Sequence, residues 1–160
     1  MRRYTVGPLA LSALVCFAAA GTPSRTAAQP PPDIRGAWSA QDYRLAVGPT
    51  HPVRGQIVFS EHDWQVVFFV LDATGAPLRG SAEGGSYERT ADGVIFRHLF
   101  NLSVGEAMDG LAEAPLRMVV RDPEDAPLEP TRIGVEEDVL TLYFPSGNRM
   151  TFLRSGRDRS

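Results

Sequence analysis

The stretch YERTADGVIFRHLFNLSV, residues 87–104, decides the fold class of this chain. It places two runs rich in β-branched and aromatic residues on either side of Asp92-Gly93, and an Asp-Gly pair favours a tight hairpin because both positions tolerate positive φ. Within residues 93–104 apolar and polar side chains alternate, as they do along a half-buried strand. The stretch therefore predicts an antiparallel hairpin.

The same pattern continues in both directions from this hairpin. Short β-branched, aromatic and aliphatic runs are separated by clusters of glycine, proline and acidic residues at short intervals, which predicts a sandwich or barrel rather than βαβ units. A second tight turn is expected at Ser146-Gly147-Asn148. We expect strands near residues 35–46, 53–60, 64–72, 79–90, 93–104, 115–122, 130–136, 138–145 and 148–154.

These elements predict an all-β domain over residues 34–154, built as a single antiparallel up-and-down barrel of eight to nine strands. A short helix or flap is expected near 105–114, where Glu, Ala, Met and Leu favour helix and Pro115 would end it. The proline-rich residues 29–33 form a lead-in, since proline cannot donate to a sheet ladder. Residues 155–160 are expected to be a disordered tail.

Residues 1–28 have the features of a secretory signal peptide. Two arginines begin the segment, an uncharged and mostly apolar run follows from Leu9 to Ala20, and small residues come after it. Ala20 and Ala28 are both suitable cleavage sites, and we favour Ala28. The run is too short for a comfortable membrane span, although a retained single-span anchor is the alternative. The expected location is therefore the periplasm or the outside of the cell, without stable membrane insertion after cleavage.

Cleavage at Ala28 would change the charge and the cysteine content of the chain. It removes three of the 16 basic residues and none of the 19 acidic ones, so the net charge falls from −3 to −6. An acidic domain repels phosphate backbones, which argues against nucleic acid as a partner. The single cysteine, Cys16, would be removed, so neither a disulfide nor a thiolate metal site could form. We expect no metal and no cofactor.

A candidate ligand site follows from the alternation of side chains along the strands. One face of residues 93–104 is more apolar and contains a histidine, and similar faces occur in 115–122 and 148–154. If these faces point into the barrel, they line either an apolar pocket for a small ligand or a fully packed core. The candidate ligand-binding residues are Phe96, His98, Phe100, Met118 and Phe152.

The sequence Gly36-Ala37-Trp38, just inside the first expected strand, resembles the Gly-x-Trp pattern of the lipocalin-like, or calycin-type, proteins. The resemblance implies that Trp38 closes one end of the barrel and that Arg154, on the last strand, packs across its ring. A guanidinium over an indole gains about 0.5–2 kcal/mol. Gly55–Ser60 with Asp63-Trp64, and Gly85–Glu88, also look like parts of bacterial lipocalin-like domains.

Three kinds of function are compatible with these features. The first is an exported barrel that binds a small hydrophobic ligand. The second is an envelope interaction or inhibitor protein that uses the exposed side of residues 64–71 or the proline-rich lead-in. The third is an isomerase or cyclase that uses His98, with Tyr87 and Glu88 as further candidates for proton transfer. We rank ligand binding first.

The favoured cleavage site leads to a direct prediction. We expect the exported chain to begin at Gln29, which Edman sequencing or an intact mass measurement will determine. A mature chain that begins at Gly21 would assign cleavage to Ala20. A chain that still contains Cys16 would contradict both sites.

Overall fold

The computed structural model describes residues 32–156. The predictions for the signal peptide, for most of the lead-in and for the tail beyond residue 156 lie outside the described residues. Within them the structure is all-β, with ten strands and no helix, hence no helix long and apolar enough to cross a membrane. The strands are β1 (Gly36–Arg44), β2 (Thr50–Phe59), β3 (Asp63–Leu71), β4 (Pro77–Arg89), β5 (Gly93–Arg97), β6 (Phe100–Gly105), β7 (Ala114–Val120), β8 (Leu128–Glu136), β9 (Val139–Tyr143) and β10 (Arg149–Arg154).

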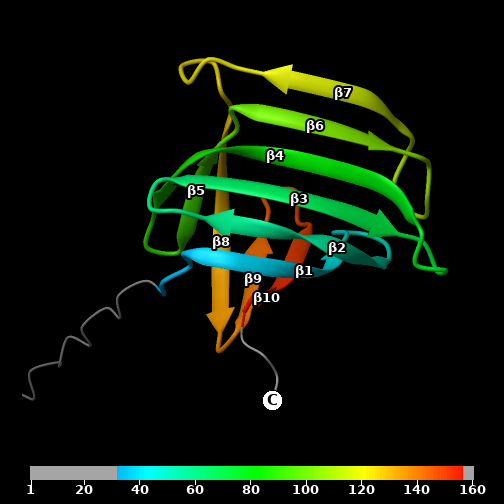
Figure 1. The fold of residues 1–160 in the computed structure, drawn as a ribbon, viewed down its shortest axis with the longest axis horizontal. Helices are drawn as coiled ribbons and strands as arrows, with labels where there is room; N and C mark the ends of the chain where they lie inside the picture. The colour runs from blue at the N-terminus through cyan, green and yellow to red at the C-terminus, as the bar shows by residue number, and fades with distance from the viewer. Residues whose placement is uncertain (1–31, 157–160) are drawn as a thin grey trace, which may run out of the picture.

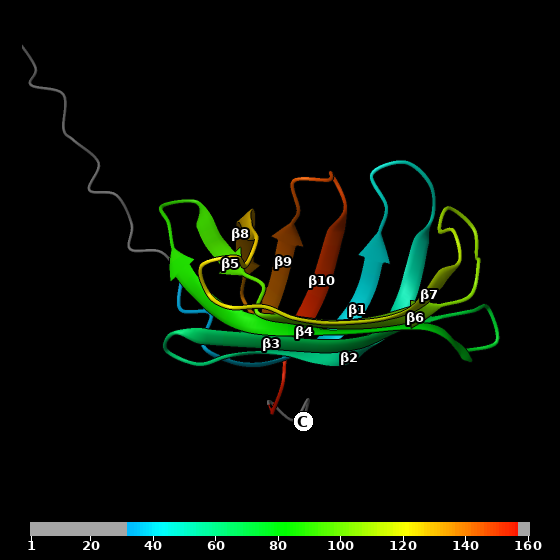
Figure 2. The same cartoon turned by 90° about the horizontal axis from the view of Figure 1, so that it is seen from above.

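Eight of these strands close into an antiparallel barrel, which confirms the predicted fold class. The wall runs β1-β2-β3-β4-β5-β8-β9-β10, and β10 pairs with β1 to complete the circle. The hairpin β6–β7 lies outside this circle and continues the layer that contains β2, β3 and β4, as Figures 1 and 2 show. Each predicted strand range overlaps an observed strand, but the range 93–104 splits into β5 and β6.

The split has a local cause on one edge of β4. There β4 pairs with β5 through Tyr87↔Phe96 and with β6 through Gly84↔Phe100, so the three residues between Phe96 and Phe100 oppose only the two between Gly84 and Tyr87. The extra residue is a β-bulge, which moves every later side chain to the opposite face. Gly85 makes this possible, because its φ is +156° and a Cβ there would lie 2.0 Å from the carbonyl oxygen of Arg97.

The bulge corrects part of the predicted inward face. Val94 and Phe96 are buried in the barrel, whereas Phe100, beyond the bulge, lies on the outer surface with 39% of its area exposed. Met118 pairs through its strand with Leu102 and therefore also points outward, 70% exposed. The expectation that these two side chains line the lumen was wrong. For Phe100 it assumed one continuous strand with unbroken alternation, and for Met118 it assumed that the strand near 115–122 belongs to the barrel wall, whereas β7 pairs with β6 outside it.

The expected helix near 105–114 is absent, and a loop between β6 and β7 takes its place in these fully described residues. Met108 and Leu111 exchange two backbone hydrogen bonds of 2.9 and 2.8 Å, which closes a two-residue turn at Asp109-Gly110. Gly110 has a φ of +72°, as such a tight turn requires. Turn chemistry at Asp-Gly therefore outweighed the helix propensity of the flanking residues.

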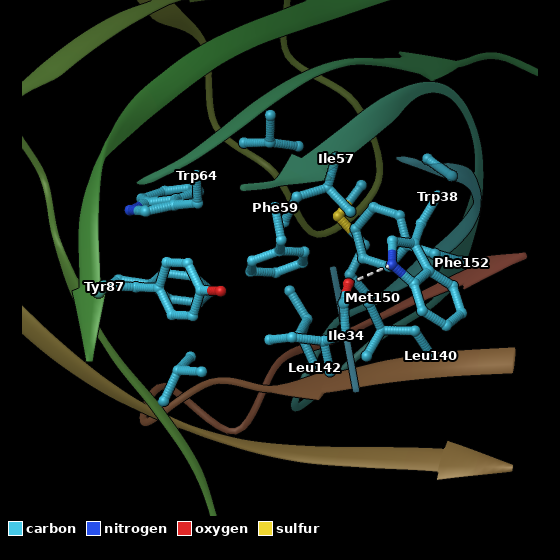
Figure 3. Close-up of a cluster of buried hydrophobic side chains, with 14 of the residues drawn as sticks. Ile34, Trp38, Ile57, Phe59, Trp64, Tyr87, Leu140, Leu142, Met150 and Phe152 are labelled. Carbon is cyan, nitrogen blue, oxygen red and sulfur yellow. Dashed lines mark hydrogen bonds between the residues drawn. The ribbon is translucent and has the colours of Figure 1, made fainter. Parts of the chain in front are cut away.

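One end of the barrel is closed around Trp38. Its indole is fully buried, and Nε1 donates a 2.7 Å hydrogen bond to the carbonyl oxygen of Ile34 (Figure 3). The guanidinium of Arg154 lies over the ring, with Cζ 4.0 Å from its centroid. Two nitrogens of Arg154 also donate to the carbonyl oxygens of Asp33 and Arg35, at 3.1 Å each. The contact that the family resemblance implies is therefore present.

The core extends from this closed end along the barrel. It is built mainly from aromatic and branched side chains that the barrel strands direct inward. Within it, Phe59 makes an edge contact with Tyr87, with 5.4 Å between the ring centroids. Burial of such side chains supplies the main stabilisation of the barrel. The largest fully buried members are Trp38, Phe59, Phe96, Phe152, Ile34, Ile57, Leu140, Leu142 and Val94.

Replacing Arg154 tests the closure at Trp38. We expect R154A to lower the free energy of unfolding by about 2 kcal/mol, since it removes one cation–π contact and two hydrogen bonds to carbonyl oxygens. Urea denaturation followed by tryptophan fluorescence measures this change. The matched control is R44A on β1, whose exposed side chain has no side-chain hydrogen bond or salt bridge within residues 32–156. Equal losses in the two variants would contradict a specific role for Arg154.

Candidate functional site

A cavity of about 190 Å³ lies inside the barrel at the end opposite Trp38 and Arg154. Its wall is mostly apolar, with apolar side chains mainly from β2, β3, β5, β9 and β10 and polar ones from β1, β4, β8 and the adjoining loops. The apolar lining residues are Ile57, Trp64, Val66, Phe68, Phe96, Leu142, Phe144, Met150 and Phe152, and the polar ones are Tyr43, Glu83, His98, Glu129, Ser146 and Asn148. Apolar walls with a few convergent polar groups are typical of small-molecule sites.

His98 occupies the gap in the barrel wall that the bulge creates. It lies between β4, which turns toward β6 at this level, and β8, which pairs with β5 only up to Arg97. Its Nδ1 is 3.1 Å from a carboxylate oxygen of Glu83, and its Nε2 is 4.0 Å from a carboxylate oxygen of Glu129. The side chains of all three residues are at least partly buried. A histidine thus stands between two carboxylates at the cavity mouth.

The Glu83 contact orients the imidazole. An ionised carboxylate can only accept, so Nδ1 donates its proton and the ring is held in one orientation. Ser81 donates a second hydrogen bond of 3.0 Å to the other oxygen of Glu83. With the ring held in this way, Nε2 is the atom of His98 that another group can use.

Two buried nitrogen atoms at this site have no hydrogen-bond partner within residues 32–156. They are Nε2 of His98 and Nε1 of Trp64, and both residues line the cavity. The two rings meet edge to face at 5.2 Å between centroids. Buried polar atoms are almost always paired with protein, water or ligand. These two nitrogens therefore mark the place where a polar group would gain most from entering the cavity.

The two carboxylates differ in their electrostatic surroundings. Burial by itself raises the pKa of Glu83, but hydrogen bonds from His98 and Ser81 outweigh it, so this pKa lies below the ordinary value. Burial raises the pKa of Glu129 above its ordinary value, against the attraction of His98 and with repulsion from Glu83. Glu83 is therefore the stable anion of the pair, and Glu129 is the carboxyl that takes up a proton more readily.

Tyr43 and Asn148 form a second polar element at the same end. The amide nitrogen of Asn148 donates a 2.6 Å hydrogen bond to the Tyr43 hydroxyl, and its side-chain oxygen accepts from the backbone of Ala46. Burial raises the pKa of Tyr43, so its hydroxyl is neutral at neutral pH. This pair joins the β9–β10 turn to the end of β1 and gives the cavity a rigid rim.

A polar groove of about 630 Å³ continues from the cavity mouth to the outside. It runs between the inner face of the β6–β7 hairpin and β8, and it shares Glu83, His98 and Glu129 with the inner cavity. Two arginines add positive charge along it. Arg121 donates a 3.2 Å hydrogen bond to the carbonyl oxygen of His98, and Arg117 is exposed. The site therefore changes from apolar inside to charged outside, with His98 at the boundary.

The structure places the predicted site residues in different locations. Phe96, His98 and Phe152 line the inner cavity, whereas Phe100 and Met118 lie on the outer surface. Gly36, Trp38 and Arg154 are at the closed end.

The remaining catalytic candidates are not assembled with His98. The Tyr87 hydroxyl donates to the carbonyl oxygen of Ser60 at 2.9 Å, and Tyr87 is not part of the cavity wall. Glu88 is exposed on β4, next to the inward-pointing Tyr87 and therefore on the opposite face. Neither side chain can exchange a proton with a group at His98. Residues 32–156 also contain no cluster of three or more His, Cys, Asp or Glu that could hold a metal ion.

Sequence reasoning missed the two carboxylates that flank His98. Glu83 follows the alternation of β4, which puts it on the same face as Ser81 and the buried Tyr87. Glu129 lies two residues before Thr131 on β8 and therefore on the same face, and Thr131 is 2% exposed. An isolated acidic residue on the inward face of an expected strand was therefore the available signal for each. Their approach to a single histidine depends on three strands and could not be inferred from spacing.

Comparison with known proteins does not add to this description. No family model, no curated protein and no solved structure matches the chain. The function of this chain must therefore follow from the geometry of the cavity and of its polar residues.

Substitution of the two carboxylates should have opposite effects. We expect E83Q to lower the free energy of unfolding at pH 7 by about 1–2 kcal/mol, because it removes a charge-assisted hydrogen bond. We expect E129Q to leave that free energy unchanged or to raise it, because it removes a charge whose burial is unfavourable. Urea denaturation at several pH values measures both.

The pH profile provides the control. The folded-state pKa of Glu83 is lowered, so its contribution is complete above the ordinary glutamate value of 4.5 and is lost as the pH falls through the folded-state pKa. E83Q should therefore reduce the acid sensitivity of the wild type. Equal destabilisation by both variants at every pH would show that the two side chains act only through packing.

Proposed function

We propose that this chain is an exported, lipocalin-like barrel that binds a small, mainly apolar ligand with one polar group in its lumen. The observation that carries this proposal is the cavity at the open end, whose wall contains two buried nitrogens without a hydrogen-bond partner among residues 32–156. An apolar molecule would fill the inner volume, and its polar group would pair with Nε2 of His98. The Gly36, Trp38 and Arg154 arrangement supports the family resemblance, and the signal-like residues 1–28 support export.

The cavity volume limits the size of the ligand. A cavity of about 150 Å³ is enough for benzene, and the inner cavity here measures about 190 Å³. A single substituted ring, or an aliphatic chain of comparable volume, is therefore the expected occupant of the inner part. A larger ligand would have to extend past His98 into the polar groove.

The Glu83–His98 contact supports one alternative function. A carboxylate that orients a histidine is a common arrangement for a general base, since the second ring nitrogen is then positioned to accept a proton. An isomerase or cyclase would use Nε2 of His98 in this way, with Glu129 as the nearest group able to receive a proton. Tyr87 and Glu88 have no part in this alternative, because they lie away from the cavity.

Binding of two matched probes tests the proposed ligand class. We expect the purified chain to bind p-cresol and toluene in calorimetric titrations, since both fit the inner cavity and only p-cresol has a hydrogen-bonding group. H98L should weaken p-cresol by about 2–10-fold, the effect of one hydrogen bond, and leave toluene unchanged. Equal effects on the two probes would contradict the role of Nε2.

Adjacent valines on β3 supply the control for location. Val66 lines the cavity, whereas Val67 points to the outer surface. V66F should fill the cavity and abolish binding of both probes, and V67F should bind as the wild type does. Circular dichroism of each variant verifies folding. A wild-type chain that binds neither probe, or a V66F variant that retains binding, would refute the lumen as the site.

A further inference from the structure

The outer surface of β3, β4, β6 and β7 carries a continuous apolar area, which we call the extension face. It is the surface turned toward the viewer in the upper part of Figure 1. It contains eight of the ten large apolar side chains that are exposed among the described residues. They are Val67, Phe69, Phe100, Leu102, Val104, Leu116, Met118 and Val120.

Strand register shows that these side chains are neighbours. Cross-strand partners point to the same side of a sheet, and Val67 is paired through Ala82 of β4 to Leu102 of β6 and then to Met118 of β7. A parallel row runs from Gly84 through Phe100 to Val120. On β4, β6 and β7 every outward position in these rows is apolar or glycine. On β3 the outward Gln65 pairs with Gly84 and the outward Asp63 with Ser86, so polar side chains bound the extension face on that side.

Two glycines of β4 flatten the extension face. A Cβ at Gly84 would lie 2.5 Å from Cζ of Phe100, and one at Gly80 would lie 3.2 Å from Cδ1 of Phe69. The two phenyl rings therefore pack directly over the glycines and occupy the space that a side chain would otherwise fill. The result is a smooth apolar sheet surface of the kind that packs against another sheet.

The area of the extension face exceeds what a monomer usually exposes. Residues of this size have full areas of about 150–250 Å², and the eight are between 39% and 86% exposed. Together they expose on the order of 800 Å², above the roughly 300–600 Å² of the largest patch on a typical monomer. A stable dimer buries about 800 Å² on each partner. The face is thus large enough to support one complete interface.

The chemistry of the extension face identifies the partner as another copy of the same chain. A sheet surface that is apolar across β4, β6 and β7 is complementary to itself, so it can pack across a two-fold axis without any paired charge. The chain carries a net charge of −3, and the outward positions of β6 and β7 carry no acidic side chain that would oppose an identical copy. An acidic protein gains no attraction to an anionic membrane surface.

We propose that two copies pack extension face to extension face as the two layers of a sandwich. The β7 edge remains outside this contact. Arg121 donates its backbone N–H to Leu99, so by alternation the N–H groups of Met118 and Val120 point away from β6 toward the open edge. The face-to-face dimer leaves these two amides open to solvent, whereas edge-to-edge pairing of β7 would protect them.

Sedimentation of the purified chain tests the dimer. Between about 1 and 100 μM, the range in which micromolar dimers dissociate, we expect the wild type to reach twice the monomer mass. V120E and M118E should remain monomers with unchanged circular dichroism, because their side chains are 86% and 70% exposed and do not contribute to the core. The matched control is V47E, which adds the same charge at a residue 89% exposed in the loop before β2 and outside the extension face. It should dimerise as the wild type does.

Three results would overturn the proposal. The first is a wild-type protein that stays monomeric throughout this range. This result overturns the dimer whether or not the monomer also binds phosphatidylcholine vesicles in a flotation assay. The second is a dimer that persists in both M118E and V120E. The third is a wild-type dimer in which hydrogen exchange at the Met118 and Val120 amides is slowed, since that pattern identifies edge pairing.

Discussion

A single extra residue between Phe96 and Phe100 organises the functional half of this barrel. Without it, the strand that begins at Gly93 would continue along β4 as one wall element with one inward face. With it, the chain stops pairing with β8 after Arg97 and continues as β6 beside the N-terminal part of β4. The inward and outward faces of the chain are exchanged at this point. The reversal requires the close approach that Gly85 permits, since any side chain there would meet the Arg97 carbonyl.

Two consequences of the bulge account for the candidate site. The wall opens between β4 and β8, so His98 stands at a passage between an apolar interior and a polar groove. The inner face of β6 and β7 then carries polar groups such as Asn101, Ser103 and Arg117, while their apolar side chains face outward. This distribution is opposite to that of an ordinary barrel strand, and it creates the groove and the extension face together.

The two ends of the barrel have different physical roles. At the closed end, Trp38 is fully buried and its polar atom is paired, and Arg154 binds both its ring and the carbonyl oxygens of Asp33 and Arg35. At the open end, His98 and Trp64 keep buried nitrogens without protein partners in the described part of the chain. Such atoms are unfavourable in the empty site. The polar groups at the closed end therefore stabilise the fold, whereas those at the open end are available to a ligand.

The sequence by itself determined most of the strands, the turns near Asp92 and at Ser146–Asn148, and the closed end of the barrel. These depend on local alternation, on turn-forming residues and on a short motif around Trp38, all of which act over a few neighbouring residues. It did not determine the turn at Asp109-Gly110, where a helix or flap was expected. Only the tertiary structure decided the faces of β6 and β7 and the meeting of Glu83 and Glu129 at His98. A one-residue bulge depends on which strand edge is available for pairing, and Phe100 and Met118 were misplaced for that reason. Pairing partners are set by the closed barrel as a whole, so the neighbours of His98 cannot be deduced from any segment of the chain alone.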